Sequence, residues 1–482
     1  MTAWRSGAEL LKPKPMNKTC TFLFLLALSS LSGFAQLNWT TPVNYATPTT
    51  TSTDDAIWFG DFNNDSKTDM VVRHWFTDKL TLFLNNGDGT FNAASTITSN
   101  PSLNDLVLAD FNNDTHLDIA VTNADWNASY DMLSIHLGNG NGTFQPMTSY
   151  STYGTYKYKL DAGDITGDGY KDLVVSSAGW DGFSILVNNG DGTFSDGNHY
   201  ASTHECGSIK LADFNGDTYL DVALGNGSSG WAKQIDVFFG NGDGTFNPTF
   251  TSYTTTNPPV LMVCDVDNKH GTDIVFYNPY IHSSYYLKND GFGAFTQVLI
   301  KENYEVIAVC DWNNDSYMDF VAVGFDPIHN TTTGTYIIIN DGSDTFAEPL
   351  LLDASYKGLV AKLDADAYFD FAYVNVAQQA VGVKLQIVTP PTGITQTTVG
   401  NMLIYPNPVR DILYINTGTS SETSKNYSVK IVNTLGQTMF ENAINNQLLS
   451  VDVSTLSANG IYFVQLIDQN GEIREINKFI RE

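Results

Sequence analysis

The sequence predicts an all-β protein, a seven-bladed β-propeller followed by a small C-terminal β-sandwich. Three observations predict it. The chain is rich in Gly (39 residues), Asn, Asp, Thr and Tyr, and its strongly β-favouring residues occur in short runs. A nine-residue motif recurs along residues 61–370. The residue before each motif copy is small, as a ring of strands converging on an axis requires.

The spacing of the motif matches one four-stranded blade per copy. Successive copies start 49, 54, 49, 52, 46 and 51 residues apart. In the second unit, apolar strands are expected at 106–109, 117–121 and 132–137, before a Gly-rich turn. A Phe after each turn is expected to open the fourth strand, at Phe91, Phe144, Phe194 and Phe246, with looser versions at Phe295 and Phe346.

The ends of the repeat region predict how the ring closes. The last unit runs into Thr-Pro-Pro-Thr-Gly at 389–393 and lacks a fourth strand, whereas residues 39–47 resemble the fourth strands of other units. We expect a main-chain ladder between about 39–47 and 382–388, which would remove the exposed sheet edges. The small residues before the motif copies are Gly60, Ala109, Gly163, Ala212, Cys264, Cys310 and Ala361.

The motif itself predicts calcium binding. Positions 1, 3, 5 and 9 carry oxygen side chains around a tight loop and position 7 offers its backbone carbonyl, which is the ligand order of an EF-hand loop without its helices. Hard oxygen ligands in a flexible loop favour calcium over zinc or copper. Five copies are complete, so about five ions are expected. Their ligands at positions 1, 3, 5, 7 and 9 are Asp61, Asn63, Asp65, Lys67 and Asp69; Asp110, Asn112, Asp114, His116 and Asp118; Asp164, Thr166, Asp168, Tyr170 and Asp172; Asp213, Asn215, Asp217, Tyr219 and Asp221; and Asp311, Asn313, Asp315, Tyr317 and Asp319.

The alternative for these loops is that Asn and Asp only cap hairpin turns through side-chain hydrogen bonds. Five aligned copies favour metal, because a turn does not require a carboxylate at positions 1, 5 and 9. The fifth and seventh copies (265–273 and 362–370) are expected to hold no metal, since Lys269 and Lys362 put an ammonium where the ion would sit.

Charge and targeting signals indicate an exported protein. The formal charge of -28 argues against nucleic acid or an anionic membrane as partner, and cations are the natural counterpart. Residues 1–35 are interpreted as an export signal region, with a start at Met16 and cleavage after Ala35. No other segment is long and apolar enough to span a bilayer. Cys206, Cys264 and Cys310 would remain, with one bridge between the last two as an alternative to small buried residues.

The repeats resemble a known family. The Asp-x-Asn-x-Asp-x-x-x-Asp loops and Asn-Gly-Asp-Gly-Thr-Phe turns resemble the FG-GAP/VCBS repeats of integrin α-chain propellers and related bacterial proteins, over about residues 37–390. The resemblance implies the propeller fold and calcium. Because that family includes adhesion proteins, lectins and domains attached to enzymes, it implies little about the ligand.

A different pattern begins after a linker at 391–400. In 401–482, short segments of alternating apolar and polar residues are separated by turn residues, which predicts a small β-sandwich. The propeller is expected to span 36–390. This segment, with Tyr-Pro-Asn-Pro at 405–408 and Lys-Phe-Ile at 478–480, is similar to the C-terminal sorting domain of type IX secretion cargo. The resemblance implies contact with that secretion machinery, passage across the outer membrane, and removal of the domain or attachment at the surface.

The loops opposite the metal loops carry the candidate ligand-binding residues, whose aromatic rings could stack on sugars or anchor a protein. The alternative is packing between blades. We expect a monomeric binding or adhesion module for glycan or extracellular protein ligands. A polysaccharide lyase or hydrolase is the competing class, although no His-Glu-x-x-His or Gly-x-Ser-x-Gly motif occurs. The aromatic residues are Trp75, Trp126, Trp180, Trp231 and Tyr280.

Overall fold

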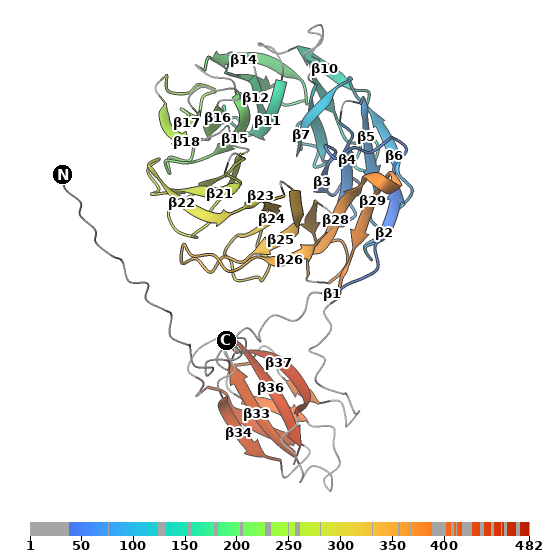
Figure 1. Cartoon of the computed structure of the whole chain (residues 1–482), viewed down its shortest axis with the longest axis vertical. Coiled ribbons are helices and arrows are strands. Elements are labelled where there is room, and N and C mark those ends of the chain that lie inside the picture. Colours follow the sequence, from blue (N-terminus) through green and yellow to red (C-terminus); the bar gives the residue numbers. More distant parts are fainter. Residues whose placement is uncertain are drawn as a thin grey trace, which may run out of the picture. The chain divides into compact units, whose positions relative to one another are not determined.

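A computed structural model of the chain contains two compact units, which are described separately (Figure 1). One unit is Trp39–Ile387 and the other lies within Val388–Glu482. The expected export region and linker lie outside the described residues. The structure describes 38–387 and 402–481, apart from 76, 124–131, 152–156, 178–181, 203–205, 227–232, 249, 256–260, 280, 330, 355–356, 367, 406–408, 411, 417–426, 434–437, 445–447, 455, 457–459 and 469–472.

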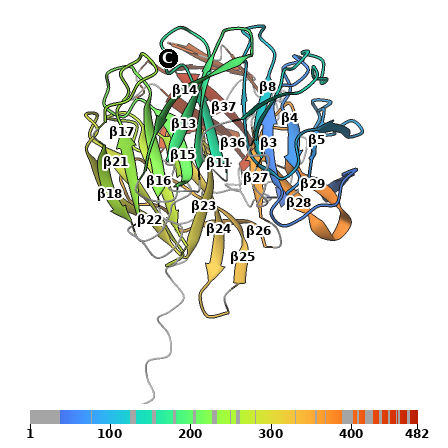
Figure 2. The ribbon, with the colours of Figure 1, turned by 90° about the horizontal axis from the view of Figure 1, so that it is seen from above.

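The described part of the first unit contains seven four-stranded antiparallel sheets, which we call blades 1 to 7 in chain order of their metal loops. Figures 1 and 2 show them arranged around a common axis. Blade 1 consists of β3 (Ala56–Gly60), β4 (Asp69–Arg73), β5 (Lys79–Phe83) and β6 (Ser95–Thr98). Blade 2 consists of β7 (Leu103–Ala109), β8 (Asp118–Asn123), β9 (Met132–His136) and β10 (Thr148–Ser151). Blade 3 consists of β11 (Lys157–Gly163), β12 (Asp172–Ser177), β13 (Phe183–Asn188) and β14 (Phe194–Tyr200).

The remaining blades repeat this order of strands. Blade 4 consists of β15 (Cys206–Ala212), β16 (Asp221–Asn226), β17 (Lys233–Phe238) and β18 (Thr251–Thr255). Blade 5 consists of β19 (Leu261–Cys264), β20 (Asp273–Asn278), β21 (Ser283–Asn289) and β22 (Phe295–Glu302). Blade 6 consists of β23 (Tyr304–Cys310), β24 (Asp319–Asp326), β25 (Thr331–Ile338) and β26 (Leu350–Asp353). Blade 7 contains β27 (Gly358–Ala361), β28 (Asp370–Asn375), the short 3₁₀ helix η1 (Val376–Gln378) and β29 (Ala380–Lys384).

The N-terminal segment completes blade 7, as the sequence predicted. Strand β2 (Val43–Ala46) pairs antiparallel with β29, with Val43 opposite Val383 and Ala46 opposite Ala380. Strand β1 (Asn38–Trp39) pairs with β30 (Gln386–Ile387). The ladder therefore involves residues 380–387, slightly earlier than the expected 382–388. It joins the two ends of the repeat region and covers the edge of β29.

A recurring hydrogen bond joins neighbouring blades. The carbonyl at position 2 of a motif copy accepts a hydrogen bond from the end of the third strand, or from the turn, of the next blade. At the junction of blades 7 and 1, Asn85 Nδ2 donates to Leu363 O at 2.8 Å, and a hydrophobic cluster spans the same junction. The other donor and acceptor pairs are Gly142 N to Phe62 O, Asn188 Nδ2 to Phe111 O, Gly244 N to Ile165 O, Asn289 Nδ2 to Phe214 O and Asn340 Nδ2 to Val266 O.

The junction between blades 6 and 7 is held by different contacts. Trp312, at position 2 of its loop, stacks on Phe369 with ring centroids 5.6 Å apart and planes 13° apart. Lys384 forms an ion pair with Asp353 across the same junction. Blade 7 lacks the Gly-rich turn that follows the third strand in the other blades. Its third strand, β29, is followed by β30 instead, so the usual donor to the carbonyl of Trp312 is missing.

We expect the Asn188→Ala variant to be about 3 kcal/mol less stable than wild type. Asn188 is 2% exposed, and its Nδ2 donates to Phe111 O at 2.7 Å and Lys171 O at 2.9 Å while its Oδ1 accepts from Gly190 N. Truncation leaves buried carbonyls without a donor. Urea unfolding measures the change. The neighbouring Asn189→Ala, at an exposed position, serves as the control and should change stability by less than about 0.5 kcal/mol.

Two of the small residues before the motif copies, Gly60 and Gly163, are in close contact with the next blade. A Cβ at Gly60 would lie 2.3 Å from Leu117 Cδ2, and one at Gly163 would lie 2.4 Å from Leu220 Cδ1. Both leucines occupy position 8 of the following motif copy. At these two positions the next blade leaves no room for a side chain.

The turn phenylalanines differ in part from the expectation, whereas the cysteines do not form the alternative bridge. Phe194 and Phe295 do open fourth strands, whereas Phe91, Phe144, Phe246 and Phe346 form isolated bridges before the fourth strand begins. Cys264 and Cys310 are free thiols, so the alternative of a bridge between them is not realised. Burial raises the pKa of both thiols to about 12.

The C-terminal unit is a β-sandwich, as predicted. Its described strands form two sheets, of orders β31-β32-β35 and β34-β33-β36-β37, which share one hydrophobic core that includes Leu413, Val429 and Phe479. The strands are β31 (Leu403–Tyr405), β32 (Ile412–Asn416), β33 (Tyr427–Asn433), β34 (Thr438–Ala443), β35 (Leu448–Asp452), β36 (Gly460–Asp468) and β37 (Ile473–Arg481).

Candidate metal-binding loops

The five complete motif copies fold into one loop geometry between the first and second strands of their blades. The carboxylate at position 1 accepts a hydrogen bond from the backbone N–H at position 6, at 2.8 to 3.0 Å in all five loops. The carboxylate at position 5 accepts from the N–H at position 7, at 2.9 to 3.1 Å. Positions 4 and 6 adopt positive φ in every loop, which favours the Gly, Asn and small polar residues found there.

Position 3 behaves in two ways. In four loops the Asn carbonyl oxygen accepts from the N–H at position 5, at 3.0 to 3.2 Å. In the third loop the Thr166 hydroxyl instead donates to Asp172 Oδ2 at 3.2 Å. Side-chain caps of the kind proposed as the alternative are therefore present in all five loops. They coexist with a calcium role, since a carboxylate or amide oxygen has a second lone pair.

The aspartate at position 9 has a structural role in all seven motif copies, which the sequence analysis missed. Its Oδ2 accepts from the N–H at position 2, at 2.8 to 2.9 Å. Its Oδ1 accepts from a backbone N–H at the end of the third strand or two residues beyond it, at 2.6 to 2.9 Å. This aspartate links three strands of its blade. The fifth and seventh copies, expected to hold no metal, retain it as Asp273 and Asp370.

Burial strongly affects these position-9 carboxylates, which are 0 to 1% exposed. Burial, together with the charges of Asp217 and Asp213, raises the pKa of Asp221 to about 7. Burial likewise raises the pKa of Asp118 and Asp319 to about 6. A cation near each loop would relieve the repulsion between its carboxylates.

We expect the metal-free protein to be more stable at pH 5.5 than at pH 7.5. The position-9 carboxylates bind a proton more tightly in the folded protein than in the unfolded chain, where the pKa of Asp is about 3.9. Their contribution to the free energy of unfolding is full below about pH 4. It is lost as the pH rises through 6 to 7, the range of the raised pKa values. Urea unfolding in chelator at the two pH values measures it. A stability that increases between pH 5.5 and 7.5 would contradict this assignment.

The two lysine-containing loops differ from the expectation in detail. The Lys269 Nζ lies 3.9 Å from Asp267 Oδ2, on a side chain that is 49% exposed. The Lys362 Nζ lies over the Phe369 ring at 5.2 Å. Within the part of the chain that the structure describes, one trio of acidic side chains brings its oxygens within 4.8 Å of one another: Asp265, Asp267 and Asp273 of the fifth loop. The tightest acidic group thus lies in a loop predicted to hold no metal.

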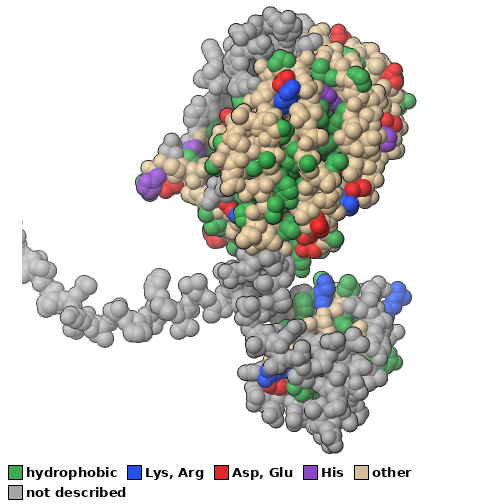
Figure 3. Space-filling model, turned by 90° about the vertical axis from the view of Figure 1, so that its right-hand side faces the viewer, with side chains coloured by type: hydrophobic (Ala, Val, Ile, Leu, Met, Phe, Trp, Pro, Cys, Tyr) green, Lys and Arg blue, Asp and Glu red, His purple; other side chains and the backbone are tan. Residues whose placement is uncertain are grey.

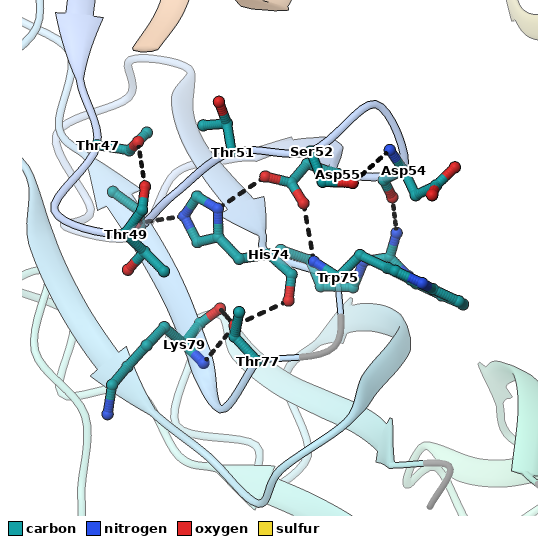
Figure 4. A network of polar contacts seen from close by, with 12 residues as sticks. Thr47, Thr49, Thr51, Ser52, Asp54, Asp55, His74, Trp75, Thr77 and Lys79 are labelled. Atoms are coloured by element: carbon teal, nitrogen blue, oxygen red, sulfur yellow. Dashed lines mark hydrogen bonds and ion pairs between the residues drawn. The ribbon is translucent and has the colours of Figure 1, made fainter. Parts of the chain in front are cut away.

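Of the five candidate aromatic residues, only Trp75 is among the described residues, and Trp126, Trp180, Trp231 and Tyr280 lie outside them. Trp75 is partly buried, and the Arg73 guanidinium lies 4.7 Å from its ring centroid. The Trp75 backbone N–H donates to Asp55 Oδ1 at 2.8 Å (Figure 4). The predicted aromatic cluster is not assembled by the described residues.

A buried polar network beside Trp75 was not foreseen from sequence. His74 Nδ1 lies 2.8 Å from Asp55 Oδ2 (Figure 4). Its Nε2 lies 2.8 Å from Thr81 Oγ1. The order Asp, His, hydroxyl resembles a hydrolase triad. However, His74 and Thr81 are both 0% exposed, so no substrate reaches the hydroxyl. The network ties the start of blade 1 to the loop after β4.

Comparison with known families agrees with this geometry. Residues 61–121, 110–175 and 164–224 match the FG-GAP-like repeat, and residues 403–482 match the secretion system C-terminal sorting domain. The protein is therefore a cell-surface or secreted protein whose propeller contains three FG-GAP-like repeats. More particularly, it carries the C-terminal sorting domain of type IX secretion and is exported or attached at the outer-membrane surface.

Other comparisons add little. No curated protein matches the sequence. Among solved structures, one similar chain is PorZ, described as an essential bacterial surface component of the type IX secretion system of Porphyromonas gingivalis. The identity is 11% and the TM-score 0.45, over 87% of this chain and 58% of PorZ. This likeness is too low to transfer a property. Within the described residues, no helix is long and apolar enough to cross a membrane.

Proposed function

We propose that the protein is a calcium-binding surface propeller that acts as a binding or adhesion module for glycan or extracellular protein ligands. The observation that carries the calcium proposal is that five loops of the same geometry have carboxylates at positions 1, 5 and 9. In the fourth loop the charges of Asp213 and Asp217 help to raise the pKa of buried Asp221 to about 7, after burial itself. A bound cation would remove that repulsion and fix the loop.

The residues at positions 1, 3, 5 and 9 and the carbonyl at position 7 would hold each ion. Backbone N–H groups already orient the carboxylates at positions 1 and 5. In the fourth loop, each carboxylate oxygen of Asp221 at position 9 accepts one N–H bond and retains a lone pair for a cation. Calcium would supply charge neutralisation and rigidity, while the chain supplies the oriented oxygens.

The binding role is supported by location and surface character. The sorting domain brings the propeller outside the cell. The side of the propeller unit seen in Figure 3 shows backbone and uncharged side chains, hydrophobic ones among them, with sparse Lys and Arg, which suits neutral ligands better than polyanions.

A glycan array probed with the full chain, in calcium and in chelator, tests the proposal. We expect binding that weakens in chelator and in Trp75→Ala. The same sugars are incubated with the protein and checked for chain cleavage. Cleavage of a sugar chain would show that the protein is an enzyme rather than a binding module. A protein that binds neither glycans nor extracellular matrix proteins would contradict the adhesion role.

A further inference from the structure

The fifth loop contains a cation from its own protein chain. The Lys288 Nζ, at the end of β21, lies 2.8 Å from Asp267 Oδ2 in the acidic trio Asp265, Asp267 and Asp273. Asp267 is 2% exposed, and its buried Oδ2 meets no donor at a hydrogen-bonding angle. The ion pair with Lys288 is therefore the closest compensation for that charge, whereas Lys269 is farther away at 3.9 Å.

Lys288 also reaches the next blade. Its Nζ donates to Asp344 Oδ2 at 2.6 Å, in the turn of blade 6, and Tyr286 Oη donates to Asp344 Oδ1. The ammonium thus bridges a metal-type loop of blade 5 and a turn of blade 6. The contacts with Asp267 and Asp344 raise the pKa of Lys288, so the group is charged at neutral pH.

The repeat shows that these three residues depart from the pattern together. The residue at the position of Lys288 is apolar in every other blade, and at several junctions it packs on the second glycine of the next turn, as Leu84 does on Gly142. At the junction of blades 5 and 6, Lys288 replaces the apolar residue and Asp344, with φ of 59°, replaces the glycine. Position 3 is Asp267 rather than the Asn or Thr of the five complete loops. The apolar equivalents of Lys288 are Leu84, Leu137, Val187, Phe239, Ile339 and Leu385.

We propose that the Lys288 ammonium is the resident cation of the fifth loop and that it holds closed a divalent-cation site formed by Asp265, Asp267 and Asp273. The acidic group would otherwise repel itself in a poorly solvated position, which is the condition that a metal relieves in the complete loops. The proposal extends the proposed calcium chemistry to another loop, but it does not require the other loops to bind calcium.

Counting bound calcium ions per chain by equilibrium dialysis tests the proposal. We expect Lys288→Met to bind one ion more than wild type. Lys269→Asp, which restores the position-5 carboxylate but leaves Lys288 in place, should bind no extra ion. Lys301→Met is the matched control, because Lys301 pairs across the same two blades with Glu348, which is 91% exposed, and should leave the count unchanged.

Thermal unfolding gives a second readout. In chelator, Lys288→Met should melt below wild type because Asp267 keeps its charge without a partner, and calcium should restore the melting temperature. The double variant Asp267→Asn with Lys288→Met should melt near wild type in chelator and bind no extra ion. A Lys288→Met chain that folds only with calcium supports the proposal.

The proposal would be overturned by an extra bound ion in Lys269→Asp, or by the lack of an extra ion in Lys288→Met. A Lys288→Met chain that calcium fails to stabilise while the double variant folds would also overturn it. A wild-type protein that binds no calcium would defeat the proposed function of the other loops. The difference between Lys288→Met and wild type would still decide the role of Lys288.

Discussion

Adding about 10 mM calcium to the chelator-treated protein is expected to raise its free energy of unfolding by about 7 kcal/mol. Extracellular calcium modules bind with dissociation constants of roughly 10⁻⁴ to 10⁻³ M. At about ten times the weaker constant, each ion contributes about 1.4 kcal/mol, and five loops are complete. The shift should appear in the urea midpoint followed by tryptophan fluorescence.

Magnesium at the same concentration is the control. Its demand for octahedral geometry and its reluctance to lose water suit these loops poorly, so we expect a much smaller shift. A urea midpoint that is the same in calcium, magnesium and chelator would mean that the loops are held by their side-chain hydrogen bonds alone.

The Asp221→Ala variant is expected to lose about 3 kcal/mol of stability even in chelator. Asp221 is 0% exposed and accepts from Phe214 N at 2.8 Å and Gly240 N at 2.8 Å. Truncation leaves two buried N–H groups without an acceptor. Because the charged form of Asp221 is itself disfavoured by burial, part of the loss is offset, and the expected value is below the sum of two orphaned donors.

The matched control for Asp221 is Asp217→Ala in the same loop. Asp217, at position 5, is exposed and accepts from Tyr219 N within the loop. In chelator this variant should unfold close to wild type, whereas in calcium it should lose one ion and its stabilisation. Equal losses for both variants in chelator would show that position 9 has no separate structural role.

The sequence was sufficient for the fold because the repeat determines it. Seven motif copies at a blade-like spacing, and a ladder between the N-terminal segment and the end of the repeat region, follow from pattern alone, although the ladder begins at Ala380 rather than at the expected residue 382. The third strand of the last unit required a partner because that unit lacks a fourth strand of its own. The N-terminal segment resembled the fourth strands of the other units.

The contacts between blades could not be predicted in the same way. Asn85, Asn188, Asn289 and Asn340 recur after the third strand, and this was the available signal for the inter-blade hydrogen bond. However, the acceptor lies 74 to 278 residues away, so only the three-dimensional ring reveals it. Lys288 was missed for the same reason, because its partners Asp267 and Asp344 belong to two other segments.

The metal loops were predicted by residue type, but not the division of labour within them. The repeated spacing of carboxylates along the chain predicts a set of metal ligands. The structure shows that position 9 binds two backbone N–H groups in every copy, so its presence alone does not indicate a metal. The carboxylates at positions 1 and 5 are what distinguish the copies predicted to bind calcium from the two copies with a lysine.

Calcium stoichiometry tests the central claim most directly. Isothermal titration of the chelator-treated full chain should give five ions, and a variant with Asp213→Asn and Asp217→Asn should give four. A wild-type chain that binds no calcium, or a double variant whose count equals that of wild type, would contradict the assignment of these loops as the calcium sites.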